Sequence, residues 1–206
     1  MSNVAAKQEA LLEFAALGTE PHCPTGMYVT PAYHDPFTWH GVQFVHRGFF
    51  AGAVLHFVIE IPTTYPSNPP TVVYRSTSLV HPLVNPATGQ VKLETRFPKW
   101  KPRQDFIVHV LHFLKSLFKR QTLDELKELD CVNIEAYQLY RERHDVFVKL
   151  ASQSALLSTT DNALYGDSKD VHKDDVVSPI KFRHLDDEED QQLRQQLQEQ
   201  VLARLR

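Results

Sequence analysis

Four short segments with the alternating pattern of β-strands follow one another between Met27 and Ser76. The third shows the pattern most clearly, because apolar side chains at every second position predict one buried face; they are Leu55, Phe57, Ile59 and Ile61. The connections are too short for the crossover helix that neighbouring parallel strands require. The sequence therefore predicts a four-stranded antiparallel meander, with Gly48 and Gly52 bracketing its central hairpin and strands within residues 27–33, 41–48, 53–61 and 71–76.

Helical patterns flank this meander on both sides. Residues 4–17 carry apolar side chains at helical spacing, and residues 104–118 carry a stronger apolar stripe that we expect to pack across the sheet. Asn133 is a suitable N-cap for a further helix over residues 134–150. An antiparallel sheet with helices before and after it belongs to the α+β class.

The apolar pattern weakens after Leu150, which divides the chain into three parts. Residues 1–26 hold the N-terminal helix and a linker to the core, residues 27–150 form the core, and residues 151–206 form a C-terminal extension. Residues 151–185 are polar and lack periodicity, and within them the segment GDSKDVHKDD (residues 166–175) is interpreted as a solvated linker.

The end of the extension has a different pattern. Residues 186–206 begin with acidic side chains and end with arginines, which suits the dipole of a charged amphipathic helix. Four apolar side chains at spacing four form a narrow face like a coiled-coil seam: Leu193, Leu197, Val201 and Leu205. These residues are candidates for partner binding. The alternatives are a helix that folds back onto the core and one that stays solvated.

Composition excludes several classes of function. A formal net charge of −3 over 206 residues gives no basic surface for nucleic acid. No apolar run approaches the roughly 20 residues of a membrane helix, and the N-terminus lacks the pattern of a signal peptide. Two cysteines, Cys23 and Cys131, are too few for a disulfide framework. We therefore expect a cytoplasmic protein that meets membranes only through partners.

Two proline-rich segments interrupt the regular patterns. Residues 62–70 must form a stiff bend, in which a cis bond before Pro66 is plausible. Residues 79–103 show neither helical nor strand periodicity. A structureless loop of this length within a compact domain is uncommon and usually functional, in this protein or in an ancestor.

The order of these features resembles the ubiquitin-conjugating enzyme fold, from about Val4 to Leu150. The motifs that carry the resemblance are Tyr65-Pro66 with Pro69-Pro70, His81-Pro82, Gly89, Trp100 with Pro102, and the helical segment IEAYQLYRERHDVF. Each motif alone is weak, because prolines punctuate many loops. Their shared order and spacing make the resemblance specific.

The resemblance implies a reaction centre whose chemistry is missing here. The family carries ubiquitin on a cysteine thiolate shortly after the loop glycine, but Val91 and Lys92 follow Gly89, and no cysteine occurs from Pro24 to Asp130. Lysine is protonated near neutral pH, and its amide with ubiquitin would be a dead end. The family's oxyanion-supporting asparagine is replaced by Leu83. We expect no catalytic residue, cofactor or metal, and a degenerate site consisting of His81, Pro82, Leu83, Gly89 and Lys92.

Among the inactive variants of this fold, the chain resembles the fused-toes (Akt-interacting protein) family. This rests on GVQFVHRGFF, HPLVNPATGQV, FPKWKP, NIEAYQLY, SPIKF and the charged helix. The resemblance implies a non-catalytic adaptor, bound to a Hook-type coiled-coil protein and a Hook-interacting protein, that links endosomal cargo to dynein and reaches endosomes or microtubules through these partners. The alternative is a ubiquitin-pathway cofactor that binds ubiquitin or an active conjugating enzyme.

Several single residues have a functional and a structural interpretation. Trp100 is a candidate partner anchor, with half-buried loop packing as the alternative. Lys92 is a candidate contact or modification site, and a solvated loop lysine is the more common case. His81 is expected to fix the loop by hydrogen bonding. His109 and His112 lie one helical turn apart, but no third metal ligand is apparent nearby.

Overall fold

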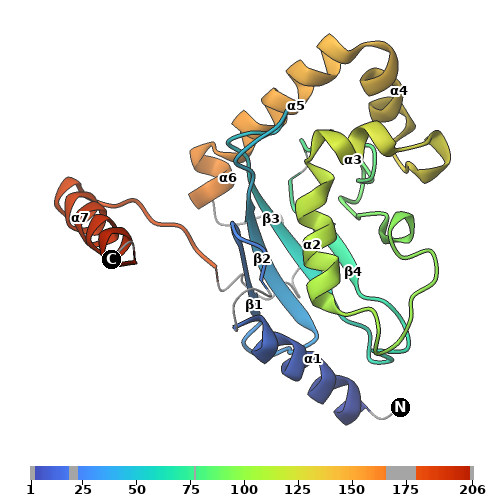
Figure 1. Ribbon diagram of the computed structural model, residues 1–206, viewed down its shortest axis with the longest axis horizontal. Helices are drawn as coiled ribbons and strands as arrows, with labels where there is room; N and C mark the ends of the chain where they lie inside the picture. Colours follow the sequence, from blue (N-terminus) through green and yellow to red (C-terminus); the bar gives the residue numbers. More distant parts are fainter. Residues whose placement is uncertain (1–2, 19–22, 77, 166–179, 205–206) are drawn as a thin grey trace.

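The computed structural model describes residues 3–18, 23–76, 78–165 and 180–204. Helix α1 (Asn3–Leu17) precedes the sheet, helix α2 (Ile107–Leu117) crosses one face of it, and α4 (Ile134–Glu142) and α5 (His144–Ser158) lie at the end of the sheet opposite α1. Helix α7 (Asp187–Arg204) stands apart from this body at the end of an extended segment (Figure 1).

The sheet is the predicted antiparallel meander. Its strands are β1 (Met27–Pro31), β2 (Thr38–Phe44), β3 (Val54–Glu60) and β4 (Thr71–Tyr74), in the spatial order β1-β2-β3-β4. The hairpin between β2 and β3 turns through Gly48 and Gly52, whose φ angles of 90° and 88° suit glycine. Strand β2 begins three residues before the predicted strand, because Trp39 faces the core, fully buried, opposite Ile59.

The core lies between the sheet and α2. The predicted apolar stripe is buried. Its residues on α2 are 0% exposed, and Phe118, just after the helix, is 3% exposed; the residues on α2 are Ile107, Val110, Leu111, Leu114 and Leu117. The Ile107 N–H at the start of α2 donates to Glu13 Oε2 of α1 at 2.6 Å. The other carboxylate oxygen of Glu13 accepts from the Tyr65 hydroxyl. One side chain of α1 therefore holds both the start of α2 and the proline-rich bend, where the Tyr65–Pro66 bond is cis.

The helix predicted over residues 134–150 is in fact two helices. Asn133 caps α4 as predicted, accepting from Ala136 N–H at 3.0 Å. The chain then bends at Arg143, whose φ of −133° and ψ of 60° are not helical, and α5 begins at His144.

The folded core continues beyond the predicted boundary at Leu150, while the predicted linker at residues 166–175 lies outside the described residues. Helix α5 continues to Ser158, with Ala151, Ser154 and Ala155 buried. Ser154 Oγ donates to Ser78 O at 2.6 Å, and Ser158 Oγ accepts from Val54 N–H of β3 at 3.0 Å. Small alanine and serine side chains let this part of the helix approach the sheet closely, so its buried face after Leu150 carries no large apolar residue that would reveal it.

Four short helices complete the described chain. They are η1 (Leu93–Thr95), α3 (Arg120–Glu125), η2 (Glu128–Asp130) and α6 (Asp161–Tyr165). Helix α7 matches the predicted charged helix closely, and Asp186 caps it by accepting from Glu189 N–H at 2.8 Å. Within the described residues, no helix is long and apolar enough to cross a membrane.

Candidate functional site

The loop after β4 is an ordered structure that pairs with the edge of the sheet. Tyr74 N–H donates to Gly89 O at 2.9 Å, and Val91 N–H donates to Val72 O at 2.8 Å. Gly89 has a φ of 73°, and a Cβ atom at this position would lie 2.1 Å from Tyr74 O. The predicted loop glycine is therefore required both by its backbone angle and by the close approach to β4.

His81 holds the loop from within the core, as predicted for a structural histidine. Its Nδ1 accepts from Leu83 N–H at 3.0 Å, so its Nε2 carries the proton and donates to Leu117 O, also at 3.0 Å. The ring is fully buried beside Phe50 and Phe118. Burial lowers the pKa of His81 to about 4, although the bond to Leu117 O opposes this shift. The ring is therefore neutral near pH 7 and has no free nitrogen for base catalysis.

Leu83 lies in the core with its side chain fully buried, so this position presents no donor to the loop surface. Its carbonyl accepts from Lys92 N–H at 2.9 Å. Two residues further on, Asn85 organises the turn: its Oδ1 accepts from Ala87 and Thr88 N–H at 2.9 and 3.1 Å. This asparagine is engaged within its own turn.

Lys92 connects two loops that are distant in the sequence. Its Nζ donates to Leu129 O at 2.9 Å, at the 3-10 helix η2. Pro82 O accepts from the N–H groups of Val132 and Asn133 at 3.0 and 2.9 Å, which fastens the same segment beside the His-Pro turn. The loop that contains Gly89 and Lys92 is thus fastened to the chain that leads into α4.

Cys131 lies near Lys92, although no local sequence pattern brings these two residues together. The thiol is buried, and its Sγ donates to Lys127 O at 3.3 Å. Burial, with help from the charge of Asp130, raises the pKa of Cys131 to about 11, although the Lys92 ammonium opposes this. Cys131 is therefore a thiol near pH 7, and a thiol is a poor nucleophile.

Trp100 is half-buried, and its indole N–H is used within the fold. It donates to Pro66 O at 2.8 Å, and its ring packs against Phe97 and Tyr65. The structural interpretation accounts for these contacts, while partner binding through the remaining exposed part of the ring stays a prediction.

The other predicted partner-binding residues are on α7. Leu193 and Leu197 are 44% and 52% exposed. Val201 lies within the helix, but its side chain is outside the described part of the chain, as is Leu205. His109 and His112 lie on the exposed side of α2, and among the described residues no group of three or more His, Cys, Asp and Glu side chains could hold a metal.

Comparison with known proteins identifies the class to which this fold belongs. Residues 13–155 match the family described as ubiquitin-conjugating enzyme. This match covers more than half of the chain, so the chain belongs to the ubiquitin-conjugating enzyme family. A crystal structure described as a ubiquitin-conjugating enzyme from Plasmodium yoelii has the same fold, with a TM-score of 0.60 and 23% identity over 72% of this chain and 91% of that one.

The curated relatives belong to one group within this class. The chain is 39% identical to the protein crossbronx homolog of Anopheles gambiae over 130 residues, which are 62% of this chain and 57% of that protein. It is 27% identical to protein crossbronx of Drosophila virilis over 77% of this chain and 65% of that protein, and 30% identical to the AKT-interacting protein of Danio rerio over 59% and 40%.

The chain thus spans between 40% and 65% of the length of these relatives. Their names confirm the resemblance to Akt-interacting proteins, and none of the three names describes a conjugating enzyme.

Proposed function

We propose that this chain is a non-catalytic adaptor built on the ubiquitin-conjugating enzyme fold. The observation that carries the proposal is the state of the reaction centre. Where the family needs a thiolate near the surface, Lys92 binds the carbonyl of Leu129, and Leu83 is a buried apolar side chain. The nearby Cys131 is buried and keeps its proton. A thioester cannot form without an accessible thiolate.

The adaptor role is supported by α7. Its leucines at positions 193 and 197 are about half exposed, and an isolated helix of this length is marginal in water. A partner helix that packs on these leucines would stabilise both helices. As the resemblance to the fused-toes family implies, we propose a Hook-type coiled-coil protein and a Hook-interacting protein as partners, and transport of endosomal cargo by dynein as the process.

The test combines two arms on the full chain. In the first, the protein is incubated with ubiquitin, activating enzyme and ATP, and we expect no thioester on a non-reducing gel. In the second, partners are captured from cytosol with the chain and with the variant Leu193→Ala plus Leu197→Ala. Gln191→Ala plus Gln195→Ala is the matched control, because these positions lie away from the leucine face.

The expected loss of affinity in the double leucine variant follows from the exposed fractions of Leu193 and Leu197. Full burial of a leucine contributes about 1.5–3 kcal/mol, and roughly half of each leucine is still available for burial. Loss of both should therefore weaken capture of a Hook-type protein by about 2 kcal/mol, or about 30-fold. Thioester formation would contradict the non-catalytic role. Recovery of ubiquitin or an active conjugating enzyme in place of a coiled-coil protein would favour the cofactor function.

A further inference from the structure

The face of the sheet that points away from α2 is covered in part by the chain's own extension. Strands β1 and β2 present Tyr28, Val42 and Phe44 on this face, and β3 adds His56 beside Val42 in the register. Val42 is 1% exposed, although it points away from the main core. A sheet face of this composition requires a cover, because apolar surface in water is unfavourable.

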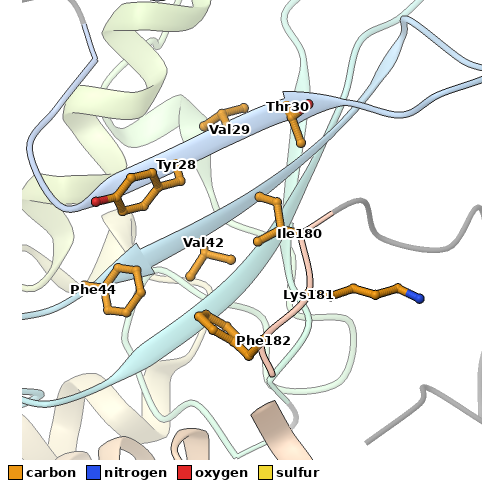
Figure 2. Close-up of a pocket in the computed structure, with 8 residues that line it drawn as sticks. All are labelled: Tyr28, Val29, Thr30, Val42, Phe44, Ile180, Lys181 and Phe182. Carbon is orange, nitrogen blue, oxygen red and sulfur yellow. The ribbon is translucent and has the colours of Figure 1, made fainter. Parts of the chain in front are cut away.

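Residues 180–182 lie across this face in an extended conformation. Figure 2 shows that Ile180 and Phe182 point toward the strands and that Lys181 points away from them. The Phe182 ring makes edge contacts with Phe44 and His56, with ring centroids 6.2 and 5.5 Å apart. The segment and strands β1 and β2 together line a groove of about 560 Å³. The segment is thus bound by side chains at alternating positions, as an extended peptide ligand would be.

The next two residues connect this segment to both flanking helices. Arg183 makes a two-point contact with Glu189 in the first turn of α7, at 2.7 and 3.1 Å. The His184 ring stacks on Tyr165 of α6, with centroids 3.8 Å apart. Exposed ion pairs contribute little to stability, so the apolar contacts of Ile180 and Phe182 supply most of the attachment.

We propose that this face of the sheet is a docking site for an extended peptide in which an apolar, a charged and an aromatic residue follow one another. The chain fills this site with its own residues Ile180, Lys181 and Phe182. This intramolecular docking attaches α7 to the core. It also keeps this face of the sheet closed to other peptides with the same pattern of residues. The inference concerns the sheet face and does not depend on which partner α7 binds.

The docked segment should be replaceable by the same residues on a separate peptide. A segment tethered to its site competes at an effective concentration of the order of millimolar. A free peptide at micromolar concentration is therefore excluded from the unaltered chain. Removing the two apolar side chains from the tether abolishes this competition and leaves the groove residues of β1 and β2 unchanged.

The experiment uses a fluorescent peptide of residues 180–186 and full-length protein. We expect the peptide to bind the variant Ile180→Ala plus Phe182→Ala at least about tenfold more tightly than the unaltered chain. Lys181→Ala is the matched control, because this side chain points away from the sheet, and it should leave the site closed. A peptide with alanine in place of Phe182 should bind neither protein. Absence of binding to the double variant, or equal binding to variant and unaltered chain, would overturn the proposal.

A second measurement does not depend on the peptide. The Phe182 ring lies against His56, and burial lowers the pKa of this histidine. We expect the single substitution Phe182→Ala to raise the His56 pKa toward its ordinary value in an NMR titration, and Lys181→Ala to leave it unchanged. An unaltered His56 titration in Phe182→Ala would mean that the segment does not occupy this face.

Discussion

Substitution of Gly89 by alanine tests whether the loop after β4 is held against this strand. An alanine at a φ of 73° costs about 1–2 kcal/mol in backbone strain. Its Cβ would also lie 2.1 Å from Tyr74 O, far closer than atoms can approach, so the loop must move away from the strand. That movement breaks the two bonds that join the loop to β4, from Tyr74 N–H to Gly89 O and from Val91 N–H to Val72 O, at 2.9 and 2.8 Å.

Each lost hydrogen bond removes about 1 kcal/mol. The expected total loss for Gly89→Ala is therefore about 3–4 kcal/mol of unfolding free energy. The matched control is Gly52→Ala, because its φ of 88° gives similar strain, while no described atom lies within 4 Å of the added Cβ. The unfolding free energy of Gly52→Ala should therefore fall only by the cost of the backbone strain, about 1–2 kcal/mol.

Thermal unfolding followed by circular dichroism measures the difference. The additional 2 kcal/mol or so should place the midpoint of Gly89→Ala about 4–8 °C below that of Gly52→Ala, at the 2–4 °C per kcal/mol typical of this chain length. Equal midpoints for the two variants would refute the close pairing of the loop with β4.

Two further perturbations test buried polar contacts. Folded His81 has a pKa of about 4, while the unfolded chain protonates it near pH 6.5. As the pH falls from 6.5 to 4, the unfolding free energy should therefore fall by about 3 kcal/mol. Urea titrations should show a shallower fall in His81→Gln, and an unchanged slope would contradict the assignment of a buried neutral ring to His81. Glu13→Ala leaves the Tyr65 hydroxyl and the Ile107 N–H without their acceptor, so it should cost about 2–4 kcal/mol in thermal unfolding. The exposed Gln8→Ala on the same helix should change stability by under about 0.5 kcal/mol, and a similar loss in both variants would argue against the Glu13 contacts.

The sequence predicted those parts of the fold that depend on local periodicity. The alternation from Leu55 to Ile61 marked β3, and the stripe of α2 marked the helix that covers the sheet. The helix was predicted to end at Leu150, because the buried face of α5 beyond that residue consists of Ala151, Ser154, Ala155 and Ser158, which carry little apolar signal. The break at Arg143 also escaped prediction, since the residue type is compatible with a helix.

The candidate site, like the fold, could be predicted from the sequence only in part. The absence of a cysteine after Gly89 can be recognised in the sequence, because residue identity alone decides it. The contact between Lys92 and Leu129 joins residues 37 positions apart, and no local pattern encodes such a pair. Phe182 similarly lies in a polar stretch, and its partners on β2 and β3 are more than a hundred residues earlier.

The two outer edges of the sheet restrict how other proteins can meet it. Strand β1, at one edge, has only five residues and ends at Pro31, which has no N–H to offer. At the other edge, β4 already gives Val72 O and Tyr74 N–H to the loop that contains Gly89. Short or occupied edges discourage an incoming strand. A binding protein must therefore recognise side chains on a face of the sheet or on a helix. The short edge at β1 and the occupied edge at β4 also suppress pairing between the sheets of two molecules.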